Sequence, residues 1–263
     1  MDHQPSSTVA FKNATSEELN LFLAYTNKSL AAPGTKWVCV SSNGKSIPCP
    51  KGVDIKPPVD YGPTGQQPAN DAGAGQWQVL TMESGANAVL QIPEFKKGQA
   101  WSIRPVKKVD GEFCTGAPDD CGMPILIETG KDMVGDMSAV DGVNYLLDYS
   151  LTSKGMSNSH QPRKEAGTTR INFSTNPCRA IGDNVKGCRN PSVDGMFKHG
   201  TSWKSKPCYA GDCNLEGQSK KWCDAVHTGQ SKPWTYCYSH DDSGSSPTFD
   251  APYKIALTYS DLD

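Results

Sequence analysis

Ten cysteines constrain the fold of this 263-residue chain more than any other feature of its sequence. Their number is even, no two are spaced as Cys-x-x-Cys, and only 5 histidines accompany them. Zinc sites are normally built from closely spaced Cys and His ligands, so the pattern favours disulfides over a metal site. We predict that the ten cysteines pair as five disulfides in an oxidising compartment. They lie at positions 39, 49, 114, 121, 178, 188, 208, 213, 223 and 237.

The local sequence suggests how two pairs of these cysteines are used. Cys114 and Cys121 enclose a short loop that contains Gly and Pro, and we predict a disulfide between them. Residues 43–75 are rich in Gly, Pro, Asn and Asp, and are expected to form a long loop pinned by Cys39 and Cys49. The connectivity of the remaining cysteines stays open.

The start of the chain and three short triplets bear on its compartment. Met-Asp-His-Gln-Pro has neither the basic nor the apolar region of a secretory signal. The two explanations are a mature secreted protein with an added Met, which we favour, and unconventional export. Asn13, Asn27 and Asn172 each begin an Asn-x-Ser/Thr triplet, the acceptor for N-glycosylation. The triplets fit secretion, although such triplets also occur by chance.

Charge and hydropathy exclude several classes of function. Lys and Arg number 26 against 28 Asp and Glu, a net charge of -2, which is not the basic balance of a nucleic-acid-binding protein. No run approaches the ~18 apolar residues of a membrane-spanning helix. The chain has no phosphate loop, dinucleotide fingerprint or Gly-x-Ser-x-Gly elbow, so we predict no cofactor. We expect a monomer without nucleic-acid partners.

Short alternating apolar and polar stretches dominate the chain and predict strands. They occur at 8–11, 19–25, 77–82, 88–93, 99–104, 123–129, 142–151 and 253–259. The first two are expected to form a hairpin. With 25 Gly and 19 Pro, turns are frequent and long helices are not expected. Strands separated by turns, with no helical run between them, indicate a β-sandwich or barrel.

Two regions differ in composition. Residues 1–152 are predicted to form a β-sandwich core, to which residues 233–263 return. Residues 153–232 hold five of the ten cysteines, are rich in Lys, Gly and Asn, and show little apolar periodicity. They are predicted to form a disulfide-rich, loop-rich lobe.

Several acidic residues cluster after a predicted strand. Glu128 ends an apolar strand, Asp136 follows, and Asp141 begins the next strand. If those strands are neighbours, the carboxylates share a site, where one can act as acid and another as base in glycoside hydrolysis. Arg104, at the end of another strand, could hold them ionised. The alternative is a turn at Asp141, a solvated Glu128 and a surface Arg104; Asp241 likewise fits a turn as well as a calcium ligand.

Four segments resemble, in the same order, the thaumatin-like proteins. They are Gly98–Arg104, Gly111–Gly122, Ile127–Asn144 and Tyr236–Leu257. The third is the most specific, because its two aspartates keep the family's spacing and are followed by the family's Gly-x-Asn. The chain departs from the family in having fewer cysteines than the large plant members and a rewritten 43–75 stretch.

The resemblance implies a mainly β, thaumatin-like β-sandwich with a disulfide-rich second lobe and an acidic cleft between them. Carried over by motif, the cleft residues are Arg104, Glu128, Asp136, Asp141 and Asp241. The family binds β-1,3-glucan, some members are weak endo-β-1,3-glucanases, and many are antifungal.

Three functions therefore stand as expectations. The first is a secreted, defence-related or cell-wall-related protein that binds β-1,3-glucan without turnover. The alternative is a slow endo-β-1,3-glucanase, with Glu128 as general acid and Asp141, together with Asp136, activating water. In both, Arg104 and Asp241 contact substrate or fix the geometry. The third is a structural protein whose cleft is a relic.

Overall fold

The computed structural model describes residues 7–26, 36–61, 75–92, 100–106, 108–113, 126–129, 135–139, 142–153, 156–158, 161–164, 167–171, 176–183, 187–191, 217–227, 235–237, 248–249 and 252–262. Within these segments the chain is mainly β, with two large sheets and little helix. The predicted mainly β class is therefore confirmed.

The first large sheet has six strands in the order β17-β14-β21-β1-β7-β3. β1 runs parallel to β21, and its other neighbour, β7, is antiparallel. The strands are β1 (Thr8–Asn13), β3 (Val38–Cys39), β7 (Asn87–Gln91), β14 (Leu146–Ser153), β17 (Gly167–Ile171) and β21 (Tyr253–Ser260).

The second large sheet has eight strands in the order β19-β12-β11-β8-β2-β6-β4, with β5 also paired to β6. Its edge pair, β12 and β19, is parallel, whereas β11, β8, β2 and β6 are antiparallel to their neighbours. The strands are β2 (Leu19–Thr26), β4 (Val53–Ile55), β5 (Val59–Tyr61), β6 (Gly75–Met82), β8 (Ala100–Pro105), β11 (Leu126–Thr129), β12 (Gly135–Ser138) and β19 (Thr235–Tyr236).

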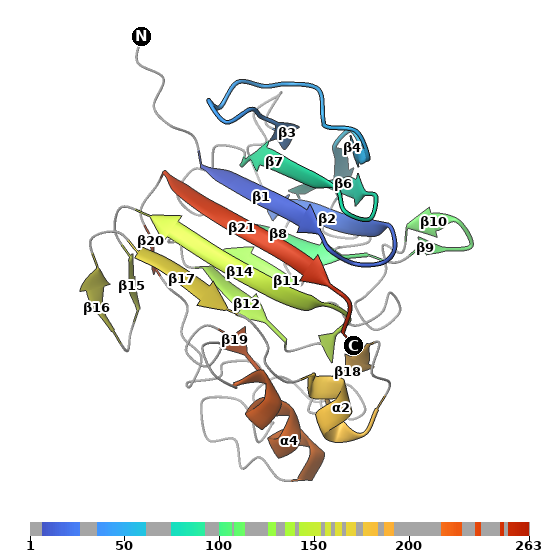
Figure 1. Cartoon of the computed structure of the whole chain (residues 1–263), viewed down its shortest axis with the longest axis vertical. Coiled ribbons are helices and arrows are strands. Elements are labelled where there is room, and N and C mark those ends of the chain that lie inside the picture. Colours follow the sequence, from blue (N-terminus) through green and yellow to red (C-terminus); the bar gives the residue numbers. More distant parts are fainter. Residues whose placement is uncertain are drawn as a thin grey trace.

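The two large sheets lie face to face around one hydrophobic core (Figure 1). Alternation along the strands produces it. In β21, Tyr253 and every second residue after it are buried, while Lys254 and Ala256 are exposed. From the other sheet, Leu21 and Leu23 of β2 enter the same core. Because each fully buried side chain of this size contributes about 1.5–3 kcal/mol, the shared core holds the sheets together.

A hydrogen bond between aromatic side chains crosses this core. Trp101 on β8 donates its indole N–H to the Tyr253 hydroxyl on β21, with 3.1 Å between Nε1 and the oxygen. Trp37 meets Trp101 edge-on, with ring centroids 5.9 Å apart. Burial raises the pKa of Tyr253, so its hydroxyl stays protonated and keeps a proton to donate. This contact links the two sheets by a polar as well as an apolar interaction.

The remaining elements are short. Two helices, α2 and α4, lie together at one end of the molecule beside β18 and β19 (Figure 1). Asn176 caps α2, and Gly182, at φ 76°, ends it in the left-handed conformation that glycine favours. These elements are α2 (Pro177–Ile181), α4 (Gly217–Val226), β9 (Lys108–Val109), β10 (Glu112–Phe113), β13 (Gly142–Val143), β15 (Met156–Asn158), β16 (Gln161–Lys164), β18 (Cys188–Arg189) and β20 (Thr248–Phe249).

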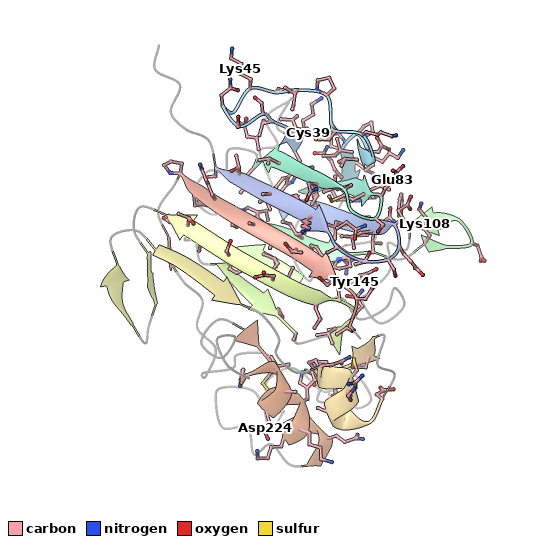
Figure 2. All side chains as sticks on the ribbon, in the orientation of Figure 1. Cys39, Lys45, Glu83, Lys108, Tyr145 and Asp224 are labelled. Carbon is pink, nitrogen blue, oxygen red and sulfur yellow. A yellow bond between two sulfur atoms is a disulfide. The ribbon has the colours of Figure 1, made fainter. Side chains whose placement is uncertain are left out.

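Three disulfides are formed by described residues. Cys39–Cys49 closes a loop beside β3, Cys178–Cys188 ties α2 to β18, and Cys223–Cys237 ties α4 to the residue after β19. Figure 2 shows the Cys39 region at the opposite end of the molecule from Asp224 on α4. The predicted pairing of Cys39 with Cys49 is confirmed. The predicted pair Cys114–Cys121 lies outside the described residues.

Two local predictions need correction. The strands at 8–11 and 19–25 exist, but they are not a hairpin, because β1 belongs to the six-stranded sheet and β2 to the eight-stranded sheet. The 43–75 stretch is not a plain loop, since β4 and β5 both pair with β6. The first error arises because local alternation identifies a strand but not its partner. The second arises because β4 and β5 are only three residues each, too short to show alternation within a Gly- and Pro-rich stretch.

The division into residues 1–152 and 153–232 stays a prediction. Six elements lie wholly within the described part of the second region: β15, β16, β17, α2, β18 and α4. Of these, β17 extends the six-stranded sheet by pairing with β14. No described helix is long and apolar enough to cross a membrane.

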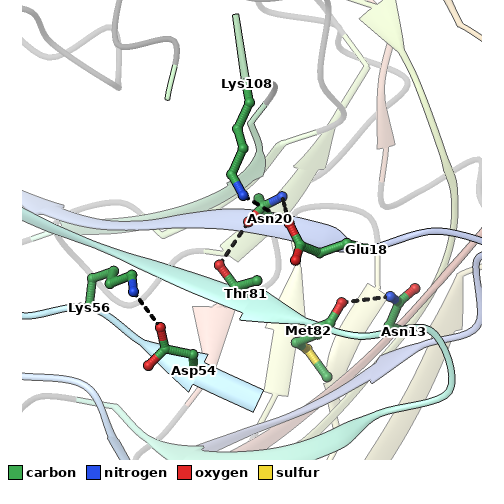
Figure 3. Close-up of polar contacts among 8 residues, drawn as sticks. All are labelled: Asn13, Glu18, Asn20, Asp54, Lys56, Thr81, Met82 and Lys108. Carbon is green, nitrogen blue, oxygen red and sulfur yellow. Dashed lines mark hydrogen bonds and ion pairs between the residues drawn. The ribbon is translucent and has the colours of Figure 1, made fainter. Parts of the chain in front are cut away.

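Asn13, the first residue of a glycosylation triplet, is fully buried. Its Nδ2 donates to the carbonyls of Glu17 and Met82 at 2.8 and 3.0 Å, and its Oδ1 accepts from the N–H and the hydroxyl of Thr15 (Figure 3 shows the Met82 contact). This side chain therefore holds the turn between β1 and β2 in place. Its amide nitrogen is occupied by these hydrogen bonds, so in the folded protein it is not available to carry a glycan.

Candidate functional site

The candidate site lies on the outer face of the eight-stranded sheet, the face turned away from the shared core. Alternation defines the two faces. Leu21 and Leu23 of β2 and Ile103 of β8 point into the core. Phe22, between the two leucines, and Arg104, next to Ile103, therefore lie on the outer face, as the backbone pleat requires. Phe22 and Arg104 are directly opposite each other in the antiparallel pair of β2 and β8.

Strand register places five residues in one line across this outer face, which we call the outer row. Trp77 on β6 is opposite Ala24 on β2, which is opposite Ser102 on β8. Ser102 is opposite Glu128 on β11, and Glu128 is opposite Asp136 on β12. With strands about 4.8 Å apart, the row extends roughly 14 Å from the strand of Trp77 to that of Glu128.

Arg104 lies two residues beyond Ser102 on β8, on the same face as the outer row. Its side chain is only 4% exposed, and its guanidinium carbon lies 5.5 Å from the centre of the Phe22 ring. A desolvated cation over an aromatic face is a favourable arrangement. Glu128 is at the diagonal position across the β8–β11 pair, a separation that a long side chain spans. The position of Arg104 thus suits it to interact with the acidic end of the row.

Aromatic side chains surround the other end of the row. The rings of Phe22 and Trp77 are 4.7 Å apart, and those of Phe22 and Phe113 are 6.5 Å apart. Phe22 is fully buried, whereas Trp77 and Phe113 are half-buried. Val59 on β5, opposite Trp77, is 46% exposed. Trp77 and Phe113 therefore combine a fixed position with accessible surface, which is what a stacking surface requires.

Two ion pairs border this aromatic cluster. Lys108 contacts Glu18 at 3.0 Å, and Lys56 contacts Asp54 at 2.6 Å (Figure 3). The hydrogen bond from Lys108 is the main cause of a pKa of Glu18 below its usual value. Lys108 also lies over the Phe113 ring, 5.2 Å from its centre. Each of these charges has an opposite charge beside it, so this border has little net charge with which to attract an ion.

The structure brings together three of the five predicted site positions. Glu128 and Asp136 occupy directly opposite positions, and Arg104 shares their face. Asp141 and Asp241 lie outside the described residues. Glu128 and Asp141 are predicted from the sequence to share one site on the condition that their strands are neighbours. None of the described strand pairs joins those two strands. β11 pairs with β8 and β12, while β13, which follows Asp141, pairs with β18.

Sequence reasoning gave no specific role to Trp77 or Phe22. β2 carries large apolar residues on both of its faces, in the order Leu19-Asn-Leu-Phe-Leu-Ala, and all of them are buried. That double-sided pattern signals a covered outer face. It could have pointed to Phe22, but only the β2–β6 register shows that Trp77 starts the row that reaches Glu128.

The described residues contain no group of three or more His, Cys, Asp or Glu side chains arranged to hold a metal ion. No protein-family model matches the sequence, and a search of curated proteins finds no match either.

Proposed function

We propose that the chain is a thaumatin-like protein that binds β-1,3-glucan along the outer row. The observation that carries the proposal is the register that aligns a half-buried Trp77 with the opposed Glu128 and Asp136 on one face of the sheet. The order of the four sequence segments that resemble the family supports the same function. The proposal includes secretion, which is consistent with the disulfides, and a role in defence or at the cell wall.

Sugar chemistry fits this combination of side chains. A pyranose ring has an apolar C–H surface that packs on an aromatic ring, and hydroxyls that donate to carboxylates. Ala24 and Ser102, between Trp77 and Glu128, are small and buried, so the sugars would contact the row at its Trp77 end and at its acidic end rather than along its middle. The neutralised ion pairs beside the aromatic cluster favour an uncharged, polyhydroxylated ligand over an ionic one.

A second candidate function is slow hydrolysis of the same glucan. Opposed residues of an antiparallel pair have Cβ atoms about 4.5–5.5 Å apart, so ionisation of Glu128 would be disfavoured by Asp136. A carboxyl that stays protonated can act as the general acid, the role proposed for Glu128. Asp141, together with Asp136, would activate water, with Arg104 and Asp241 fixing the field around the acids.

Affinity capture on insoluble polysaccharides tests both functions. The wild type is expected to be retained on β-1,3-glucan in preference to chitin and cellulose. Trp77→Ala should reduce retention strongly. Ile47→Ala removes another exposed apolar side chain, in the Cys39–Cys49 loop, and should not change it.

The release of reducing ends separates binding from turnover. Retention of the wild type with no sugar released supports a binding protein. Release that stops in Glu128→Gln supports the hydrolase. If the wild type is retained on none of the three polysaccharides, both carbohydrate functions are rejected.

A further inference from the structure

We propose that Asn190 is a positioning residue. It holds β12 and β19, the two strands at the acidic end of the outer row, in place relative to the disulfide-linked helices α2 and α4. This inference rests on the proposed function. Asn190 follows β18 and is fully buried. Its Nδ2 donates to the Cys237 carbonyl at 2.6 Å and, through a longer contact of 3.5 Å, to the Ala139 carbonyl. One carboxamide thus joins two chain segments that are far apart in the sequence.

Both acceptors lie where a strand of the edge pair ends. Ala139 directly follows β12, and Cys237 directly follows β19. These two strands pair over only two positions, Met137 with Thr235 and Ser138 with Tyr236. A parallel pair this short is stabilised little by its own backbone hydrogen bonds. A side-chain link between the two strand ends therefore contributes much of the stability of the pair.

Two disulfides hold the partners of this link. Cys188, two residues before Asn190, is bonded to Cys178 in α2. Cys237, the stronger acceptor, is bonded to Cys223 in α4, and α2 packs against α4. The donor and one acceptor are therefore both fastened to the same pair of helices. A fixed donor positions its acceptors more closely than a mobile one would, because less conformational entropy remains to be lost.

The link acts on the strand that carries the acid pair. Asp136 is on β12, opposite Glu128, and three residues before the Ala139 acceptor. In the sequence, Asp141 follows Ala139 by two residues and Asp241 follows Cys237 by four. Asn190 does not touch the ligand in this proposal. It sets the register and the separation of β12 and β19, the strands that precede Asp141 and Asp241 in the sequence.

The chemistry requires an amide rather than an acid at this position. Both partners are carbonyl oxygens, and a carboxamide supplies two N–H donors, whereas an ionised carboxylate supplies none. Asn190→Asp keeps the shape and removes the donors at neutral pH. Burial against carbonyl oxygens raises the pKa of such a carboxyl, so that at pH 5 its protonated form donates again to one acceptor. Acidification should therefore restore the function of this variant.

The test compares Asn190→Asp with Asn13→Asp, a matched control. Asn13 is equally buried and also donates from Nδ2 to two carbonyls, but it lies on β1 beside Met82, five residues along β6 from Trp77. Binding of a soluble β-1,3-gluco-oligosaccharide is measured at pH 7.5 and pH 5 for both variants and the wild type. Hydrogen exchange of the backbone amides in 135–139 and 235–237 is measured without ligand.

We expect Asn190→Asp to bind about tenfold more weakly than the wild type at pH 7.5, as for a buried hydrogen bond lost with its acceptor left unpaired. At pH 5 the difference should shrink, and Asn13→Asp should bind like the wild type at both values. Exchange in β12 and β19 should be faster in Asn190→Asp alone.

Other outcomes overturn the inference. Equal binding by Asn190→Asp and the wild type would show that the link does not position the site. Equal weakening by both variants would show a general effect of stability. If the wild type does not bind, the proposed function fails, and exchange still decides the link: unchanged protection of β12 and β19 in Asn190→Asp rejects it.

Discussion

Removing one charge from the opposed acid pair should stabilise the fold while it weakens glucan binding. Glu128 and Asp136 are Cα partners in the antiparallel pair of β11 and β12. Like charges directly opposite each other destabilise a sheet. Glu128→Gln keeps the size of the side chain and removes one of the two charges. A residue pair kept at a cost in stability is typical of a functional site.

The size of the effect follows from the register. Two unit charges about 5 Å apart repel by about 0.8 kcal/mol at the dielectric constant of water and about 3 kcal/mol at an effective value of 20. Measured cross-strand pairs fall at about 0.2–1 kcal/mol. We therefore expect Glu128→Gln to raise the free energy of unfolding by about 0.5–1 kcal/mol at pH 7. Asp136→Asn should give a similar gain.

Urea unfolding of the wild type, both single variants and the double variant measures this coupling. Either substitution relieves the same repulsion, so the double variant should gain no more than one of them. The gain should shrink as acid protonates the carboxyls and removes the repulsion, and it should decrease in 1 M salt. Asp148→Asn is the control, because Asp148 on β14 is opposite Thr258 rather than another acid.

Two results would refute this reasoning. A loss of stability in Glu128→Gln at pH 7 would mean that the ionised carboxylate makes a favourable contact that outweighs the repulsion. Strictly additive gains in the double variant would mean that the two side chains do not interact, and the opposed register would then have no electrostatic consequence.

Three further predictions concern stability. Tyr253→Phe removes the acceptor of the Trp101 indole N–H in the core and should lower the free energy of unfolding by about 1–3 kcal/mol; a change below about 0.5 kcal/mol in urea unfolding would contradict it. Lys108→Met should cost up to about 1 kcal/mol more at pH 7 than near pH 2, where only the contact of Lys108 with the Phe113 ring is lost. The lowered pKa of Glu18 means that the contribution is present at neutral pH and is lost as the pH falls through that pKa; an equal cost at both pH values would argue against the ion pair. Asn13→Ala removes four hydrogen bonds and should cost about 2–4 kcal/mol, and mass spectrometry of secreted protein should find no glycan on Asn13; a glycosylated, folded fraction would contradict the second part.

The mainly β class and most of the strands could be predicted, because period-two alternation is a local property of the sequence. β6, β8 and β21 lie where alternation placed a strand, whereas the single strand predicted at 142–151 is divided into β13 and β14. The Cys39–Cys49 disulfide could also be predicted, although the reason given for it, a long loop over 43–75, was wrong. The separation of β1 and β2 into different sheets could not, because it is decided by distant strands: β21 pairs with β1, and β6 and β8 pair with β2.

The candidate site, like the fold, has features that the sequence determined and features that only the tertiary structure decided. By itself the sequence determined that Arg104, Glu128 and Asp136 are present and near or within strands, and alternation determines on which side of its own strand each residue lies. Only the tertiary structure decided that Glu128 faces Asp136, that Trp77 lies in line with them, and that Asn190 joins the ends of β12 and β19. The physical reason is that strand partners are selected by burying two whole sheet faces together, a long-range gain in free energy that no local pattern records.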